Sequence, residues 1–294
     1  MATALHLAFI PEVTLAQSAE GLLTLQTRTT RLIVRHSTPG LQAMIQVLAG
    51  SGATQDALQA LVLQTDDAEV LPRFYYYLNR FQAKGILRTT LLAAGQPLAT
   101  LCPLVEARLP QPQRLTATAR VVLSRFAYCR RVGQHWQLES PLAPARILLH
   151  GGRGAALVAA LAQPQDRHSL AQAVPEISVD GSEMFLALLA QGGMRSTVDA
   201  TGQSSEETQD TLGQWEFHDL LFHSRSRVGR HDNPWGGTYR FLDHFPPSRQ
   251  SNLRCPAPYC RSIRQTSRRS KLPTVPSQTS SKPVARSGST ATRR

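Results

Sequence analysis

The spacing of apolar residues over the first hundred positions predicts three short strands, then three helices, then a β-hairpin. Leucine and β-branched residues alternate with polar ones at 5–10, 22–26 and 31–35, which is typical of strands. Apolar residues then recur three and four positions apart, which is the period of a helix with one buried face. The first helix is expected to bury Leu41, Met44, Ile45 and Leu48.

Two more helices and a hairpin are expected to follow. Thr54 is predicted to cap the second helix, and Asp66 with Glu69 three positions later has the spacing of a capping box for the third. Gly85 suits the position just after the third helix. Residues 86–101 hold two apolar runs around a turn sequence and predict a hairpin, or wing. The expected buried stripe of the third helix is Val70, Phe74, Leu78 and Phe81.

The same order of elements starts again near residue 125, which indicates an internal repeat. Asp180 and Glu183 repeat the capping spacing at the start of the third helix, which is expected to end at Gly192. The expected strands are 126–130, 134–139 and 146–149, and the expected shorter helices are 155–161 and 169–174.

We therefore predict an α+β chain with two tandem winged-helix-like modules, a docking helix and a disordered basic tail. Prolines between the two copies support a linker there. The predicted boundaries are 1–102 for module 1, 103–122 for the linker, 123–200 for module 2, 201–213 for a loop, 214–245 for a junction segment and 246–294 for the tail.

Composition narrows the classes of partner. The net charge is +12, but residues 246–294 hold 11 of the 32 lysines and arginines and no acidic residue, which leaves 21 basic and 20 acidic residues before them. No run approaches the roughly 20 apolar residues that span a membrane, and the first residues lack a basic signal-peptide start. The four cysteines form no CxxC pair and predict reduced thiols. We expect a cytoplasmic protein without a membrane partner.

Neither predicted third helix suits DNA, although winged helices often bind it. Binding to DNA needs lysine and arginine near the phosphates, on or beside the recognition helix. The first such helix opens with Asp66, Asp67 and Glu69, and the second, 180–191, contains no lysine or arginine. We therefore do not expect nucleic acid as a partner, unless the basic tail supplies all of the positive charge.

A peptide partner suits the first module better. An extended peptide can add to an exposed edge strand and gain main-chain hydrogen bonds, while neighbouring side chains select its sequence. Basic residues at such an edge would favour an acidic peptide. The predicted peptide-binding residues are Arg31, Ile33, Arg35, Arg73, Tyr76 and Arg80. The alternative is that the modules are spacers, which we favour for the second module because its third helix lacks basic residues.

The segment 214–241 has the most specific sequence. Its aromatic and leucine residues predict a helix with one apolar face, followed by a turn and a strand. No HExxH or comparable ligand frame is present, so we predict a docking helix and no metal site. The residues that a metal site would have used are His218, Asp219, His223, His231 and Asp232.

This segment resembles the junction of SagB-type dehydrogenases, which are azoline oxidases of ribosomal peptide clusters and include the cyanobactin oxidases. The resemblance covers roughly 214–247 and rests on the runs 217–232 and 236–241. The upstream repeat also resembles that family's tandem winged-helix region. The resemblance implies an FMN-dependent oxidation of thiazolines or oxazolines in a nitroreductase-like domain. It further implies a precursor peptide as partner, and a homodimer or a partner cyclodehydratase.

The residues after 241 depart from that family. They lack acidic residues beyond Asp243 and show little apolar periodicity, so we expect no flavin domain, no bound FMN and no catalytic or cofactor-binding residue in this chain. A shifted reading frame or truncated gene is the favoured explanation, and a native basic tail is the alternative. Residues 260–265 resemble an FMN-phosphate motif, but we assign none of them as a site.

Three functions remain open at this point. The first is the peptide-recognition part of a SagB-type azoline dehydrogenase. The second is a non-enzymatic winged-helix protein that binds nucleic acid through its basic tail. The third is a stand-alone peptide adaptor.

Overall fold

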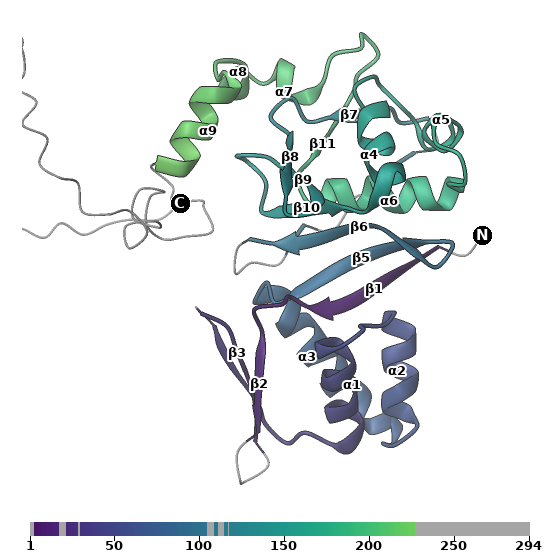
Figure 1. Cartoon of the computed structure of the whole chain (residues 1–294), viewed down its shortest axis with the longest axis vertical. Helices are drawn as coiled ribbons and strands as arrows, with labels where there is room; N and C mark the ends of the chain where they lie inside the picture. The colour runs from purple at the N-terminus through teal and green to yellow at the C-terminus, as the bar shows by residue number, and fades with distance from the viewer. Residues whose placement is uncertain are drawn as a thin grey trace, which may run out of the picture. The chain divides into compact units, whose positions relative to one another are not determined.

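Helices alternate with antiparallel sheets along the computed structural model, which describes residues 3–17, 22–28, 30–104, 109–110, 115–116 and 118–226 (Figure 1). The predicted α+β class is therefore confirmed. The predicted tail and the end of the junction segment lie outside these ranges. Within them the longest helices have 13 residues, and none is long and apolar enough to cross a membrane.

The first module combines a three-stranded antiparallel sheet with a helical layer. The sheet has the order β2-β3-β4, and its apolar face packs on the helices through Leu25, Leu32, Met44 and Phe74. The strands are β2 (Thr14–Gln17), β3 (Leu23–Gln26) and β4 (Arg31–Val34). The helices are α1 (Pro39–Ala49), α2 (Gln55–Leu63), the short 3-10 helix η1 (Ala68–Val70) and α3 (Leu71–Ala83).

Asp66 serves a different helix from the one predicted. Thr54 caps α2 as expected, but the Asp66 carboxylate accepts hydrogen bonds from the Thr38 hydroxyl and from the Gly40 N–H at 3.1 Å, at the start of α1. The capping box of Asp66 and Glu69 is therefore wrong, and η1 occupies the residues where it would form. The free N–H groups of α1 lie next to this carboxylate only in the folded chain, so sequence spacing could not show the competition.

A six-stranded antiparallel sheet joins the two modules. Its order is β1-β5-β6-β10-β9-β8. Strand β6 of the first hairpin pairs with β10, with Leu101 opposite Ile147. The predicted linker therefore connects two modules whose strands share hydrogen bonds. The strands are β1 (Thr3–Phe9), β5 (Leu87–Ala93), β6 (Gln96–Pro103), β8 (Tyr128–Val132), β9 (His135–Glu139) and β10 (Ala145–Leu149).

Both hydrophobic cores draw on this sheet. Leu87, at the start of β5, belongs to the core of the first module, whereas Leu91 on the same strand belongs to the core of the second. Leu101 and Ile147 also belong to the second core and are almost fully buried. A single strand thus contributes to both cores.

Three helices and two short strands complete the second module. The helices are α4 (Gly151–Ala160), α5 (Arg167–Ala173) and α6 (Val179–Gln191), and the strands are β7 (Val121–Leu123) and β11 (Arg195–Thr197). The sequence did not predict β7, which lies at the end of the expected linker and pairs with β11. Three residues are too few to show a period.

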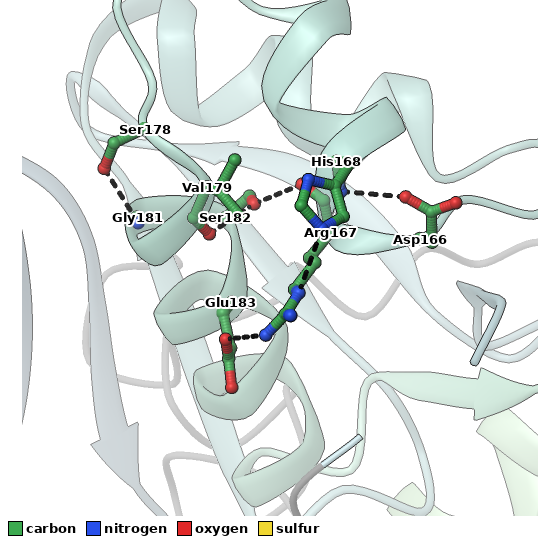
Figure 2. Close-up of polar contacts among 8 residues, drawn as sticks. All are labelled: Asp166, Arg167, His168, Ser178, Val179, Gly181, Ser182 and Glu183. Atoms are coloured by element: carbon green, nitrogen blue, oxygen red, sulfur yellow. Dashed lines mark hydrogen bonds and ion pairs between the residues drawn. The ribbon is translucent and has the colours of Figure 1, made fainter. Parts of the chain in front are cut away.

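Helix α6 begins at a serine, not at the acidic residue that the sequence indicated. The Ser178 hydroxyl accepts a hydrogen bond from the Gly181 N–H at 3.0 Å (Figure 2). Glu183 points to α5, where it pairs with Arg167 at 2.6 Å. The capping spacing of Asp180 and Glu183 is therefore wrong, because Ser178 occupies the N-cap position and Glu183 pairs with a neighbouring helix.

A buried hydroxyl strengthens the contact between α5 and α6. Ser182 is fully buried, and its Oγ lies 2.5 Å from the carbonyl oxygen of Arg167 and 2.8 Å from that of Val179. Asp166 caps α5 by accepting from the His168 N–H at 2.8 Å. These polar contacts hold the two helices over the apolar face of the sheet.

Candidate functional site

Strand β4 forms an open edge of the three-stranded sheet. Among the residues that the structure describes, it pairs with β3 on one side and with no strand on the other. The hairpin closes with the hydrogen bond from Thr27 N–H to Thr30 C=O, at 2.8 Å. Hydrogen-bonded and non-hydrogen-bonded pairs alternate along an antiparallel ladder. The main-chain groups of Leu32 and Val34 therefore face β3, and those of Arg31 and Ile33 face outward.

All six predicted peptide-binding residues are exposed and lie on two elements. Arg31 and Ile33 are on β4, and Arg35 follows it directly. Their side chains point away from the core, in alternation with the buried Leu32 and Val34. The other three are on α3: Arg73, Tyr76 and Arg80. The structure thus presents a basic, apolar and basic sequence of side chains along the open edge.

Helix α3 is tied directly to the end of β4. The Tyr77 hydroxyl accepts from the Arg35 N–H at 3.0 Å and donates to the Arg35 C=O at 2.8 Å. Arg73 Nη1 donates to the carbonyl oxygen of His36 at 3.2 Å. Tyr77 is not among the residues predicted from the sequence, although it lies four positions after Arg73 and so shares a helix face with it.

The same face of α3 carries aromatic and basic groups. The guanidinium of Arg80 lies 5.7 Å from the centre of the Tyr76 ring and donates to its hydroxyl. Tyr76 is 52% exposed, and Ile33 is 37% exposed. Edge main-chain groups, apolar surface and positive charge therefore occur together here, which is the combination that binds an extended acidic peptide.

In the second module the strand that corresponds to β4 does not lie at an edge. Its corresponding strand, β10, is hydrogen-bonded to β6 on one side and to β9 on the other. A peptide cannot add to a strand whose two sides are paired. This agrees with the spacer interpretation that we favoured for the second module.

A buried polar group lies on the six-stranded sheet. The hydroxyls of Thr90 and Thr100 are 2.9 Å apart, and Thr100 Oγ1 lies 2.8 Å from His150 Nε2. Burial lowers the pKa of His150, and the nearby His135 and Arg88 lower it further. These effects favour the neutral imidazole of His150, which ends a chain of hydrogen bonds that starts at Thr90 on β5 and passes through Thr100 on β6.

The two cysteines in the described ranges are free, and neither is activated. Burial raises the pKa of the Cys102 thiol despite the opposing charge of Arg146 and Arg88. Burial also raises the pKa of Cys129. A raised pKa keeps a thiol protonated, and the thiolate is the nucleophile. The described part of the chain also contains no group of three or more His, Cys, Asp or Glu residues that could hold a metal ion.

The junction segment docks on the second module. Arg125 donates from Nη2 to the carbonyl oxygens of Leu212 (3.2 Å) and Trp215 (2.5 Å), and Glu206 accepts from the Arg125 N–H at 2.9 Å. Two short helices replace the expected loop because Ser204 and Glu207 form a capping box. These helices are α7 (Ser205–Thr208) and α8 (Asp210–Gly213).

Helix α9 (Phe217–Ser226) follows, as the sequence predicted for the docking helix. The Phe217 ring contacts Tyr128 of β8 with centroids 5.5 Å apart, and Leu220 is buried. His218, Asp219 and His223 are exposed. The other residues considered for a metal site, at 231 and 232, lie outside the described residues.

Comparison with known families yields two matches. Residues 121–232 match the family model of cyanobactin oxidase ThcOx, and residues 1–109 match the model of the ThcOx helix turn helix domain. No curated protein matches the chain. The second match covers β4 and α3, and the first covers the second module and the junction segment through α9. Both matches are to parts of one oxidase, so the chain is similar to cyanobactin oxidase ThcOx over its two modules and its junction segment.

Proposed function

We propose that this chain provides the peptide-recognition region of a SagB-type azoline dehydrogenase. In this proposal an acidic, extended segment of a precursor peptide adds to the open edge of β4 beside α3. The enzyme to which the region belongs would oxidise thiazolines or oxazolines of that peptide to thiazoles or oxazoles. The observation that carries the proposal is the unpaired edge of β4 next to four exposed arginines.

The edge supports peptide binding through its backbone. Arg31 and Ile33 each direct one N–H and one C=O away from β3. Each net main-chain hydrogen bond to a peptide contributes about 0.5–1.5 kcal/mol. Four such bonds give useful affinity only when side-chain contacts add to them. The exposed Ile33 and Tyr76 supply apolar surface for that purpose.

Charge supports an acidic ligand. Arg31, Arg35 and Arg80 are exposed beside the edge, and among the described residues no carboxylate forms an ion pair with them. Arginines at a rim mainly raise the association rate and select the sign of the ligand charge. A peptide with acidic residues four positions apart would place them opposite Arg31 and Arg35.

The FMN of the resembled family does not fit this surface. A flavin needs an enclosed pocket for its ring and basic groups at its phosphate. The arginines of β4 and α3 are exposed beside a strand edge, so they suit a peptide and not a flavin. The motif 260–265 lies outside the described residues. FMN, a homodimer and a partner cyclodehydratase are therefore proposed for the enzyme to which this region belongs.

Fluorescence anisotropy tests the proposal with a labelled synthetic peptide of the pattern Glu-x-Ile-x-Glu, where x is serine, so that its two glutamates and its isoleucine lie on one face of the added strand. We expect it to bind the full chain, and a lysine version of the same peptide to bind much more weakly. Arg31→Glu and Arg73→Glu should each weaken binding by about 5- to 30-fold, since each replaces an attraction with a repulsion. Arg31 is the cleaner site because Arg73 also donates to His36.

Arg131→Glu is the matched control. Arg131 is exposed on β8, at another sheet edge, and its substitution by glutamate changes the net charge by the same amount as Arg31→Glu. It should leave peptide affinity nearly unchanged. Equal effects of Arg31→Glu and Arg131→Glu would mean that only overall charge matters and would refute the β4 site. Binding of labelled duplex DNA without binding of the acidic peptide would favour the nucleic-acid alternative.

A further inference from the structure

The open edge of β4 ends abruptly at Arg35. Arg35 lies two residues after Ile33, so its N–H and C=O also face away from β3. Both groups are already bonded to one atom, the Tyr77 hydroxyl oxygen, at 3.0 and 2.8 Å. Tyr77 is only 6% exposed, and its hydroxyl therefore occupies the place that the next strand would take.

The chain also turns away just beyond this point. His36 has a φ of 53°, in the left-handed region that residues other than glycine rarely adopt. Arg73 of α3 donates a hydrogen bond to the carbonyl oxygen of His36. Two side chains of α3 thus fix the end of the strand, and a peptide on β4 cannot extend its ladder past Ile33.

We infer that Tyr77 is a positioning residue that terminates the ladder and so sets the register of the peptide that adds to β4. This inference rests on the proposed function of that edge. A peptide antiparallel to β4, like the other pairs of this sheet, would exchange hydrogen bonds with Ile33 and then, two residues later, with Arg31. Tyr77 blocks the hydrogen-bonded pair that an earlier peptide residue would otherwise form with Arg35.

This register specifies the ligand chemistry. Directly opposed residues of an antiparallel pair place their side chains on the same face of the sheet. The peptide residue opposite Ile33 would therefore be apolar, and the residue two positions towards its C-terminus, opposite Arg31, would be acidic. A second acidic residue, two positions before the apolar one, would lie beside Arg35. It can contact Arg35 only through its side chain, because the main-chain groups of Arg35 are already hydrogen-bonded to Tyr77. The preferred segment therefore has one apolar residue, with one acidic residue two positions before it and another two positions after it.

Amide hydrogen exchange of the full chain tests the inference without a variant. In the free protein the Arg35 amide should exchange much more slowly than those of Arg31 and Ile33, because only Arg35 is hydrogen-bonded. The labelled glutamate and isoleucine peptide should slow Arg31 and Ile33 and leave Arg35 unchanged. An Arg35 amide that exchanges as fast as that of Ile33 would overturn the inference.

Tyr77→Phe provides the second measurement. The ring stays stacked on Phe81, with centroids 6.1 Å apart, so the core remains filled while the hydroxyl is lost. Removing the hydroxyl frees both groups of Arg35 for a longer ladder. A peptide lengthened by two residues at its N-terminus should then gain about 2- to 10-fold in affinity in Tyr77→Phe, and should gain little in the parent.

Tyr75→Phe is the matched control on the same helix. The Tyr75 hydroxyl donates to Gln59 at 2.7 Å, on a different side of α3 from β4. This variant should show the length dependence of the parent. The same length dependence in Tyr77→Phe and the parent would refute the terminator role. If no peptide bound any of the three proteins, the proposed function would fail, whereas the exchange of Arg35 in the free protein would still report on Tyr77.

Discussion

The shared sheet predicts that the two modules unfold together, and Leu101→Ala is the sharpest test. Leu101 is 1% exposed, lies on β6 opposite Ile147 of β10, and belongs to the core of the second module. The substitution removes three carbons, which costs about 2.4 kcal/mol of transfer free energy, and the cavity brings the loss to roughly 3–4 kcal/mol. For a chain of this size the melting temperature should fall by about 6–15 °C.

Native-state hydrogen exchange can follow both modules at once. If the sheet makes them cooperative, the amide of Phe74 in α3 and that of Phe185 in α6 should both lose about 140- to 700-fold of protection in Leu101→Ala, which is the loss of 3–4 kcal/mol expressed as a ratio. Leu5→Ala on β1 is the control, because the same change at a side chain 39% exposed should cost about 1 kcal/mol or less. Loss of protection at Phe185 with none at Phe74 would refute the coupling and favour independent modules.

Two further predictions concern a carboxylate and a glycine. Burial alone would raise the pKa of Glu139, but hydrogen bonds from Arg130, Tyr128 and Gln137 lower it below its ordinary value. A lowered folded-state pKa stabilises the protein above the unfolded pKa of about 4.3, and this stability is lost as the pH falls. Glu139→Gln should therefore lower the free energy of unfolding by about 1–3 kcal/mol near pH 7, as measured by urea unfolding. On acidification the variant should lose less stability than the parent. Equal slopes of unfolding free energy against pH in the two proteins would contradict this. Gly154→Ala should destabilise the chain by about 1–3 kcal/mol, because the new Cβ would lie 2.6 Å from the Leu98 carbonyl oxygen. Gly152→Ala is the control, because a Cβ there would meet open space, and it should be neutral in the same assay.

Much of the candidate site could be predicted from the sequence. The alternation of Arg31, Ile33 and Arg35 with buried leucine and valine identifies an amphipathic strand, and the structure exposes all three. The helical period likewise placed Arg73 and Arg80 on the outer side of α3. Side chains that alternate between core and solvent follow from local periodicity, which a sequence displays directly.

Tyr77 shows where that reasoning stops. Its neighbours Tyr75 and Tyr76 have the same side chain, yet only Tyr77 reaches the main chain of β4, 42 positions away. Which of three consecutive tyrosines meets the strand depends on how α3 is rotated against the sheet. That rotation is set by the packing of Phe74, Leu78 and Phe81 in the core.

The sequence by itself determined the α+β class, the order of most elements and the exposed basic edge. Each of these follows from local propensity and from the two- and 3.6-residue periods of strands and helices. Only the tertiary structure decided that β6 pairs with β10, that this pairing closes one potential peptide edge while β4 stays open, and which helix Asp66 caps. Strand pairing and cap sharing join residues distant in the chain, and their choice among competing partners is made by packing of the whole fold.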